Sequence, residues 1–220
     1  MVGQPERRKL MIKKNLKTLI ITSVAILLPI LAGIILWDKL PDQIPTHWNA
    51  QGEIDGWSSK TFAIFGLPLI MLAIQWLAVI VTCSDPKRNN HSEKILNFVL
   101  WIVPVLCILL SALMYSVAMG KDIPLEAITP ALLGLLFIVI GNYMPKCKQN
   151  YTIGIKIPWT LNSEENWNKT HRFAGWLWVI GGIFITATSL FSLIWISLPA
   201  IFIMTLIPMI YSYILHRKGI

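Results

Sequence analysis

The side chains best suited to chemistry lie in a short polar stretch, residues Pro41 to Lys60, which interrupts an otherwise apolar sequence. His47, Glu53 and Asp55 are close together in this stretch, and all three are side chains that bind metal ions. Their spacing matches neither two histidines one helical turn apart nor the alternating acidic pattern of a calcium loop. We therefore expect that the stretch holds no metal ion and no other cofactor.

The same stretch is suited to binding a ligand. Trp48 and Trp57 flank its acidic residues, and aromatic side chains beside acidic ones suit a cationic or amphipathic peptide. The glycines and prolines within it favour a compact, ordered loop. In the simpler alternative, Asp42, Asn49 and Asp55 satisfy backbone groups in tight turns, and the tryptophans anchor the loop at the membrane interface. The candidate ligand-binding residues are His47, Trp48, Asn49, Glu53, Asp55 and Trp57.

A second polar stretch, residues 142 to 172, is the longest segment between apolar runs. It contains a helix start, predicted with Asn162 as the cap and acidic residues in the first turn. Glu164, Trp167 and His171 then fall on one face of the predicted helix. This helix either lies on the membrane surface or, with the apolar run before it, forms a docking surface for a cytoplasmic partner. The candidate partner-binding residues are Lys156, Trp159, Glu164, Trp167, His171 and Arg172.

Neither polar stretch contains a recognised catalytic motif, so we expect that the protein is not an enzyme. The alternative is a membrane enzyme or a small-solute transporter that uses His47, Glu53 and Asp55. The apolar runs contain no Asp, Glu, Lys or Arg, which disfavours an ion-coupled transporter. The cysteines show neither a disulfide pattern nor a zinc-binding pattern, and they are Cys83, Cys107 and Cys147.

Two motifs resemble those of a known family. The segment LPDQIPTHWNAQGEIDGWSSK, from Leu40 to Lys60, resembles the signature of the DUF1648 domain. The segments GNYMPK from Gly141, NYTIGIKIPWTL from Asn150 and NWNKTHRFAG from Asn166 resemble the C-terminal half of the SdpI immunity family. Together the motifs and the apolar runs around them cover nearly the whole chain.

This resemblance implies a function in bacterial immunity. Proteins of the SdpI type protect a bacterium from its own secreted killing peptide, a toxin or bacteriocin. They are also implicated in signalling, because they hold a cytoplasmic transcriptional repressor at the membrane when the toxin is present. Carried over to this sequence, the resemblance implies that residues 41–60 meet the toxin and residues 141–175 meet the repressor.

The composition indicates that both polar stretches belong to a membrane protein. Hydrophobic residues make up 55% of the 220 residues, charged residues make up 14%, and the mean hydropathy is +0.62. The first apolar run, Thr18 to Trp37, is long enough to cross a bilayer as a helix. No small-residue cleavage site follows this run, so we expect a retained transmembrane helix rather than a signal peptide.

The remaining apolar runs define the other spans. The uncharged run from Phe173 to Leu215 is about twice as long as one span, so it must fold back, with a turn expected between Ser192 and Pro199. The sequence thus predicts an all-α polytopic membrane protein with six transmembrane helices. The three spans between the first run and the hairpin are Phe62 to Cys83, Ile95 to Met119 and Ala127 to Gly141.

The basic residues predict the orientation of these spans. Of the 19 Lys and Arg, 16 lie in alternate segments: the amino terminus, residues 84–94, residues 142–172 and the tail. By the positive-inside rule both termini are cytoplasmic and residues 41–60 are outside. The net charge of +8 then reflects topology and the anionic lipid bilayer, and no binding of nucleic acid is needed. We expect two halves, a DUF1648-like half (residues 1–83) and an SdpI-like half (residues 84–220).

Overall fold

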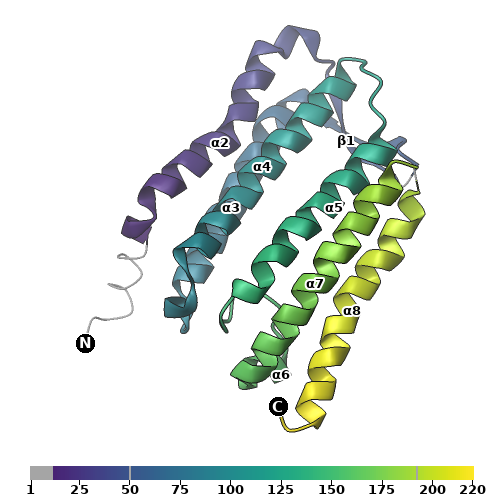
Figure 1. The fold of residues 1–220 in the computed structure, drawn as a ribbon. Coiled ribbons are helices and arrows are strands. Elements are labelled where there is room, and N and C mark those ends of the chain that lie inside the picture. Colours follow the sequence, from purple (N-terminus) through teal and green to yellow (C-terminus); the bar gives the residue numbers. More distant parts are fainter. Residues whose placement is uncertain (1–11, 50, 192) are drawn as a thin grey trace. The chain divides into compact units, whose positions relative to one another are not determined.

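The computed structural model describes residues 12–49, 51–191 and 193–220, which form long helices and one β-hairpin (Figure 1). The long helices are α2 (Leu16–Ile35), α3 (Leu67–Cys83), α4 (Glu93–Ala118), α5 (Leu125–Tyr143), α7 (Glu164–Ser189) and α8 (Ile194–Arg217). The short helical segments are η1 (Trp37–Lys39), η2 (Phe62–Gly66), η3 (Arg88–Asn90), η4 (Met144–Lys146) and α6 (Pro158–Asn162).

Five helical segments among the described residues are long and apolar enough to cross a membrane. They are Leu16–Ile35, Phe62–Cys83, Glu93–Ala118, Leu125–Lys146 and Trp195–Arg217. Large apolar side chains such as Ile20, Val24 and Leu31 are exposed on these helices, as expected for surfaces that face lipid. The helix α7 is equally long but begins with the polar residues 164–172. A polytopic helical membrane protein is therefore supported, while the number of six spans stays a prediction.

The stretch from Pro41 to Lys60 forms a β-hairpin, so the expectation of an all-α fold is wrong here. Strands β1 (Gln43–Trp48) and β2 (Ile54–Ser59) pair antiparallel, with a register irregularity on both sides of His47. Alternating Ile44, Thr46 and Trp48 are residue types that favour strands. Ile44 is fully buried, and the Thr46 and Ser58 hydroxyls lie 3.0 Å apart across the two strands.

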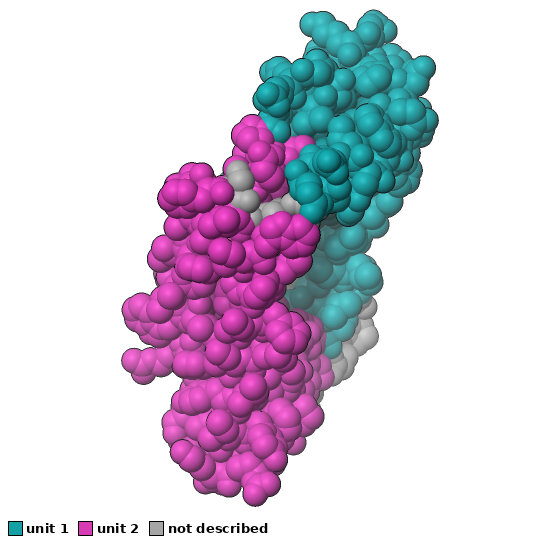
Figure 2. Space-filling model, turned by 90° about the vertical axis from the view of Figure 1, so that its right-hand side faces the viewer, with its two compact units in different colours: residues 1–84, 96–123 teal, residues 85–95, 124–220 magenta. Residues whose placement is uncertain are grey.

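The described chain divides into two compact units (Figure 2). Unit 1 comprises residues 1–84 and 96–123, and unit 2 comprises residues 85–95 and 124–220. In unit 1, the buried Ile44 of the hairpin joins Ile64 of η2 and Tyr115 of α4 in one apolar cluster. The Tyr115 hydroxyl donates a 3.2 Å hydrogen bond to the carbonyl of Pro29 in α2. The hairpin is thus fixed to the helices of unit 1 by apolar packing.

Unit 2 is built around closely packed helices. Helices α5, α7 and α8 run side by side (Figure 1). A Cβ atom at Gly182 of α7 would lie 2.5 Å from the carbonyl oxygen of Gly134 in α5, and one at Gly141 would lie 2.8 Å from that of Gly175. Small residues allow such backbones to approach, as is usual between membrane helices.

The helical hairpin predicted for residues 173–215 exists, but its turn comes earlier than expected. Helix α7 ends at Ser189 and α8 begins at Ile194, so Pro199 lies inside α8 rather than at its start. A proline inside a membrane helix is tolerated when neighbouring groups satisfy the freed carbonyl. Ser192, the other end of the predicted turn, lies outside the described residues.

The predicted helix start near residue 163 is present with a different cap. The Ser163 hydroxyl accepts a 3.1 Å hydrogen bond from the backbone N–H of Asn166, with Glu164 and Glu165 in the first turn. Asn162, the expected cap, is instead the last residue of α6. The helix that begins here continues without a break to Ser189 and is not a separate surface helix.

Candidate functional site

The turn of the hairpin is shaped by Asn49. Its side-chain oxygen accepts hydrogen bonds from the backbone N–H groups of Gln51 and Glu53, at 2.9 and 3.0 Å. Its side-chain nitrogen donates to the Glu53 carboxylate at 2.9 Å. Gly52 adopts a positive φ of 78°, which favours glycine. Asn49 and Glu53 therefore hold the turn, and the role of Asn49 agrees with the simpler alternative, in which it satisfies backbone groups.

His47 and Asp55 face each other across the two strands. The His47 Nδ1 and Asp55 Oδ1 atoms are 2.5 Å apart, while 72% and 44% of the two side-chain surfaces remain exposed. An exposed pair of this kind contributes little to stability, about 0–1 kcal/mol. Among the described residues, no three His, Cys, Asp or Glu side chains are placed to hold a metal ion. The pair is therefore available for contact with a ligand.

The two tryptophans of the hairpin have different environments. Trp48 is half-buried against the apolar cluster of unit 1, whereas Trp57 is 55% exposed. Near the base of the hairpin, the Lys60 ammonium lies 5.2 Å from the ring centre of Trp37 and 3.4 Å from the Asp42 carboxylate. The exposed ring of Trp57 is the part of this element best placed to meet a partner.

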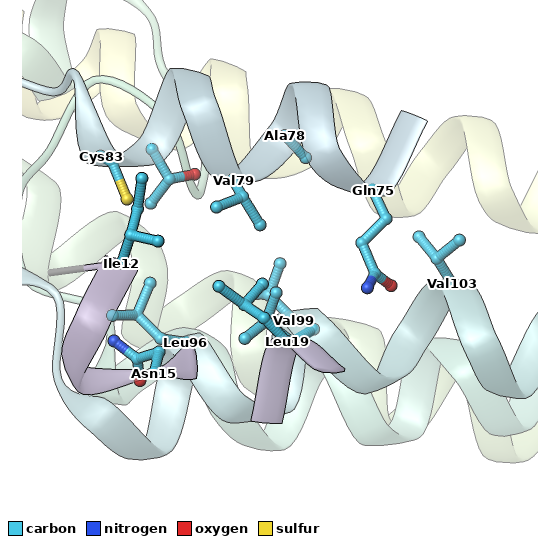
Figure 3. Close-up of a pocket in the computed structure, with 12 residues that line it drawn as sticks. Ile12, Asn15, Leu19, Gln75, Ala78, Val79, Cys83, Leu96, Val99 and Val103 are labelled. Carbon is cyan, nitrogen blue, oxygen red and sulfur yellow. The ribbon is translucent and has the colours of Figure 1, made fainter. Parts of the chain in front are cut away.

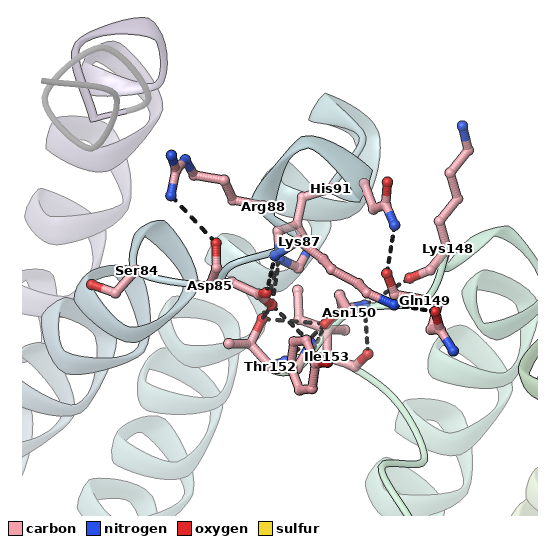
Figure 4. A network of polar contacts seen from close by, with 12 residues as sticks. Ser84, Asp85, Lys87, Arg88, His91, Lys148, Gln149, Asn150, Thr152 and Ile153 are labelled. Carbon is pink, nitrogen blue, oxygen red and sulfur yellow. Dashed lines mark hydrogen bonds and ion pairs between the residues drawn. The ribbon is translucent and has the colours of Figure 1, made fainter. Parts of the chain in front are cut away.

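The second polar stretch is folded around Asn150. We call residues 147–163 the motif loop. The buried side chain of Asn150 accepts hydrogen bonds from the N–H groups of Thr152 and Ile153, at 2.8 and 2.6 Å, and donates to the carbonyls of Lys148 and Ile153 (Figure 4). One amide thus satisfies four backbone groups of a loop that carries no strand. Asn150 was not among the predicted site residues.

A buried carboxylate, that of Asp85, connects the motif loop to the segment before α4. It accepts hydrogen bonds from the N–H of Lys87 at 2.7 Å, the N–H of Tyr151 at 2.9 Å and the hydroxyl of Thr152 at 3.1 Å. The Nε2 atom of His91 lies 3.2 Å from the same carboxylate (Figure 4). Residues 85–91 and 150–152, far apart in the sequence, therefore form one polar network within unit 2.

The electrostatics of this network favour a charged Asp85 and a neutral His91. Burial raises the pKa of Asp85, but the hydrogen bonds from Lys87, Tyr151 and Thr152 outweigh it, so the pKa lies below its ordinary value. Burial lowers the pKa of His91, against the opposing effect of Asp85. The neutral imidazole then donates Nε2–H to the carboxylate, so the buried charge has donors on all sides.

Trp167 and His171 are buried against the motif loop. The Trp167 indole donates a 2.7 Å hydrogen bond to the carbonyl of Cys147, and its ring stacks on His171 at 3.9 Å between centres. The Nε2 atom of His171 accepts a 2.9 Å hydrogen bond from the N–H of Ile155, and Nδ1 donates to the carbonyl of Trp167. Burial lowers the pKa of His171 to about 4, so the ring is neutral at neutral pH.

The remaining predicted partner-binding residues lie on the surface of unit 2. Lys156, Glu164 and Arg172 are exposed. Trp159 is half-buried, with its ring centre 5.1 Å from that of Tyr213 in α8. Of the six predicted residues, three are exposed, Trp159 is half-buried, and Trp167 and His171 are buried.

Sequence reasoning missed Asp85 and His91, although a weak signal was present. Asp85 precedes a proline and accepts a hydrogen bond from the N–H two residues later, which is the pattern of an Asx turn. That signal predicts a local turn only. The partners Tyr151 and Thr152 are more than 60 residues away, and nothing in the local pattern points to them.

These features define a multi-pass helical membrane protein with two folded polar segments. The DUF1648 domain of unknown function matches residues 24–72, which include the hairpin, and the SdpI/YfhL protein family matches residues 146–212, which include the motif loop and α7. The chain is 29% identical over 209 residues to the immunity protein SdpI of Bacillus subtilis (strain 168), covering 94% of this chain and 97% of that protein. The family-model match and this similarity agree, so two comparisons support the resemblance to the SdpI/YfhL protein family. No solved structure matches it.

Proposed function

We propose that this protein is an immunity protein that protects a bacterium from a secreted peptide toxin. The observation that carries the proposal is the similarity to an immunity protein over nearly the full length of both chains. Both polar segments fall within the matched region, so the proposal covers the hairpin as well as the motif loop. Immunity of this kind requires a toxin-binding surface and a membrane body, without a catalytic centre.

The hairpin is the proposed surface that meets the toxin. Trp57 supplies an exposed aromatic ring, and Asp55, paired with His47, supplies an exposed carboxylate on the same strand, which suits a cationic or amphipathic peptide. Asn49 and Glu53 contribute by holding the turn, and Trp48 contributes by fixing the hairpin to the core of unit 1. A turn that is held by hydrogen bonds before binding has less conformational entropy to lose, which favours affinity.

Trp57 is the residue whose loss tests this surface. In a toxin-sensitive bacterium that produces the protein, Trp57→Ala should lower the toxin concentration that the cells survive by roughly tenfold, since central aromatic residues often dominate binding. Tyr151→Ala is the matched control, because this ring is also exposed but lies in the motif loop. Survival is measured at equal amounts of protein in the membrane. Failure of the unsubstituted protein to protect against any secreted peptide toxin would refute the immunity proposal itself.

The proposed topology has six spans, with α7 as the additional one. The uncharged part of α7, residues 173–189, is somewhat shorter than the about 20 residues that a span needs. Six spans place both termini on the same side, whereas five would place them on opposite sides. The distribution of basic residues favours six spans, with both termini cytoplasmic and the hairpin outside.

Cysteine labelling tests the orientation that both topologies share, with the hairpin outside and the motif loop inside. Gln51→Cys in the hairpin should react with a membrane-impermeant maleimide in intact cells, and Lys148→Cys in the motif loop should react only after permeabilisation. Both positions are exposed. The native cysteines Cys83, Cys107 and Cys147 are buried, so the unsubstituted protein gives the background. Labelling of the Lys148 variant alone in intact cells would mean that the motif loop lies outside and the hairpin inside.

The surface of the motif loop is the proposed site for a cytoplasmic repressor. If the toxin and the repressor bind at different sites, each must shift the same conformational equilibrium for one to affect the other. The double variant Lys156→Glu, Arg172→Glu should release a membrane-recruited repressor while survival is retained. Recruitment is followed by cell fractionation, and recruitment that resists both charge reversals would place the repressor elsewhere. The exposed residues of this surface are Lys156, Glu164 and Arg172, with half-buried Trp159 beside them.

A further inference from the structure

Helices α2, α3 and α4 enclose a pocket within unit 1 (Figure 3). The cavity volume is ≈ 70 Å³, and the pocket is partly open to the outside. Its wall is almost entirely apolar and includes Leu19, Val79 and Leu100. None of the residues that line it belongs to the hairpin or to the motif loop.

One polar side chain in this wall, Gln75, is only half satisfied. Gln75 is 2% exposed, and Figure 3 shows it pointing from α3 into the pocket. Its side-chain nitrogen donates a 2.8 Å hydrogen bond to the Thr22 hydroxyl, which itself donates to the carbonyl of Thr18. Among the described residues, the Oε1 atom of Gln75 has no hydrogen-bond partner. A buried acceptor without a donor is costly, especially in a membrane helix.

We propose that this pocket binds an uncharged, lipid-like molecule that carries a hydroxyl group. The hydroxyl would donate its hydrogen to Oε1 of Gln75, and the hydrocarbon part would lie against Leu19, Val79 and Leu100. The apolar wall disfavours a charged ligand, because a buried charge needs a partner. All three helices are candidate membrane spans, so a ligand of this kind can reach the pocket from the bilayer. This site is additional to the toxin-binding hairpin and does not depend on the immunity proposal.

The test compares two ligands that differ only in the hydrogen-bond donor. The full-length protein in lipid nanodiscs is labelled with a long-chain alcohol that carries a photoreactive diazirine, in competition with 1-decanol or with decyl methyl ether. We expect the labelled peptides to come from the pocket-lining parts of α2, α3 and α4. We also expect 1-decanol to compete roughly tenfold better than the ether, because only the alcohol can donate to Gln75.

Two variants check the assignment. Gln75→Leu should remove the difference between alcohol and ether, and Ala78→Phe, which fills the pocket, should reduce labelling in the presence of either competitor. Gln43→Leu, at an exposed glutamine of β1, is the matched control and should label like the unsubstituted protein. The proposal is overturned if no label reaches the pocket, or if the ether competes as well as the alcohol. The second result would mean that apolar contact alone, with water at Gln75, explains binding. Because the ligand comparison uses the unsubstituted protein, it tests the proposal even if a variant fails to fold.

Discussion

Gly154→Ala is expected to prevent stable folding of the motif loop. Gly154 has a φ of +118°, and a Cβ atom there would lie 2.4 Å from Nε2 of His171 and 3.1 Å from the Trp167 ring. These neighbours cannot move freely, because the same Nε2 atom accepts from Ile155 and the Trp167 indole donates to Cys147. Backbone strain of about 1–3 kcal/mol adds to the loss of at least one buried hydrogen bond, which costs about 1–3 kcal/mol.

A matched glycine separates strain from collision in this experiment. Gly219 also has a positive φ, 83°, but an added Cβ atom there meets nothing within 4 Å. Gly219→Ala should therefore lower the melting temperature of the detergent-purified protein only slightly, whereas Gly154→Ala should lower it strongly or abolish the yield of folded protein. Equal effects of the two substitutions would show that His171 and Trp167 do not confine position 154.

The helices were largely predictable because their signal is long and local. An apolar run of about 20 residues is sufficient to predict a membrane span, and the predicted span at residues 62–83 coincides with η2 and α3. The β-hairpin was missed for the opposite reason. Its strands have six residues each, a proline lies within β1, and the register is irregular near His47. Such a short and irregular pattern does not distinguish strands from an ordered loop.

The site was harder to predict than the fold, because periodicity does not show what covers a helix face. The spacing of Glu164, Trp167 and His171 predicts one shared helix face, which would either lie on the membrane surface or form part of a docking surface. In the structure Trp167 and His171 are buried by the loop around Gly154 and Ile155, and Glu164 alone is exposed. Only contacts between distant parts of the sequence determine which side is covered.

Substitution of Asp85 is the second change that we expect to lower stability strongly. Its carboxylate is the acceptor shared by the polar network in unit 2. Asp85→Ala leaves the N–H groups of Lys87 and Tyr151 and the hydroxyl of Thr152 without this acceptor. Each buried donor left without an acceptor costs about 1–3 kcal/mol. Asp85→Ala should therefore weaken the attachment of residues 85–91 to the motif loop, where the hydrogen bonds to Gln149 and the contact between His91 and Thr152 remain, and strongly reduce the melting temperature.

Two further substitutions give this prediction its controls. Asp122→Ala removes an exposed carboxylate from another loop and should change the melting temperature little. Asp85→Asn should have an intermediate effect, because its amide oxygen can still accept from Lys87 while its NH₂ group cannot accept from Tyr151. Hydrogen exchange at Tyr151 and Thr152 should increase in the order unsubstituted protein, Asn variant, Ala variant. An Ala variant with native stability and unchanged exchange at these amides would mean that the Asp85 network does not hold the motif loop in place.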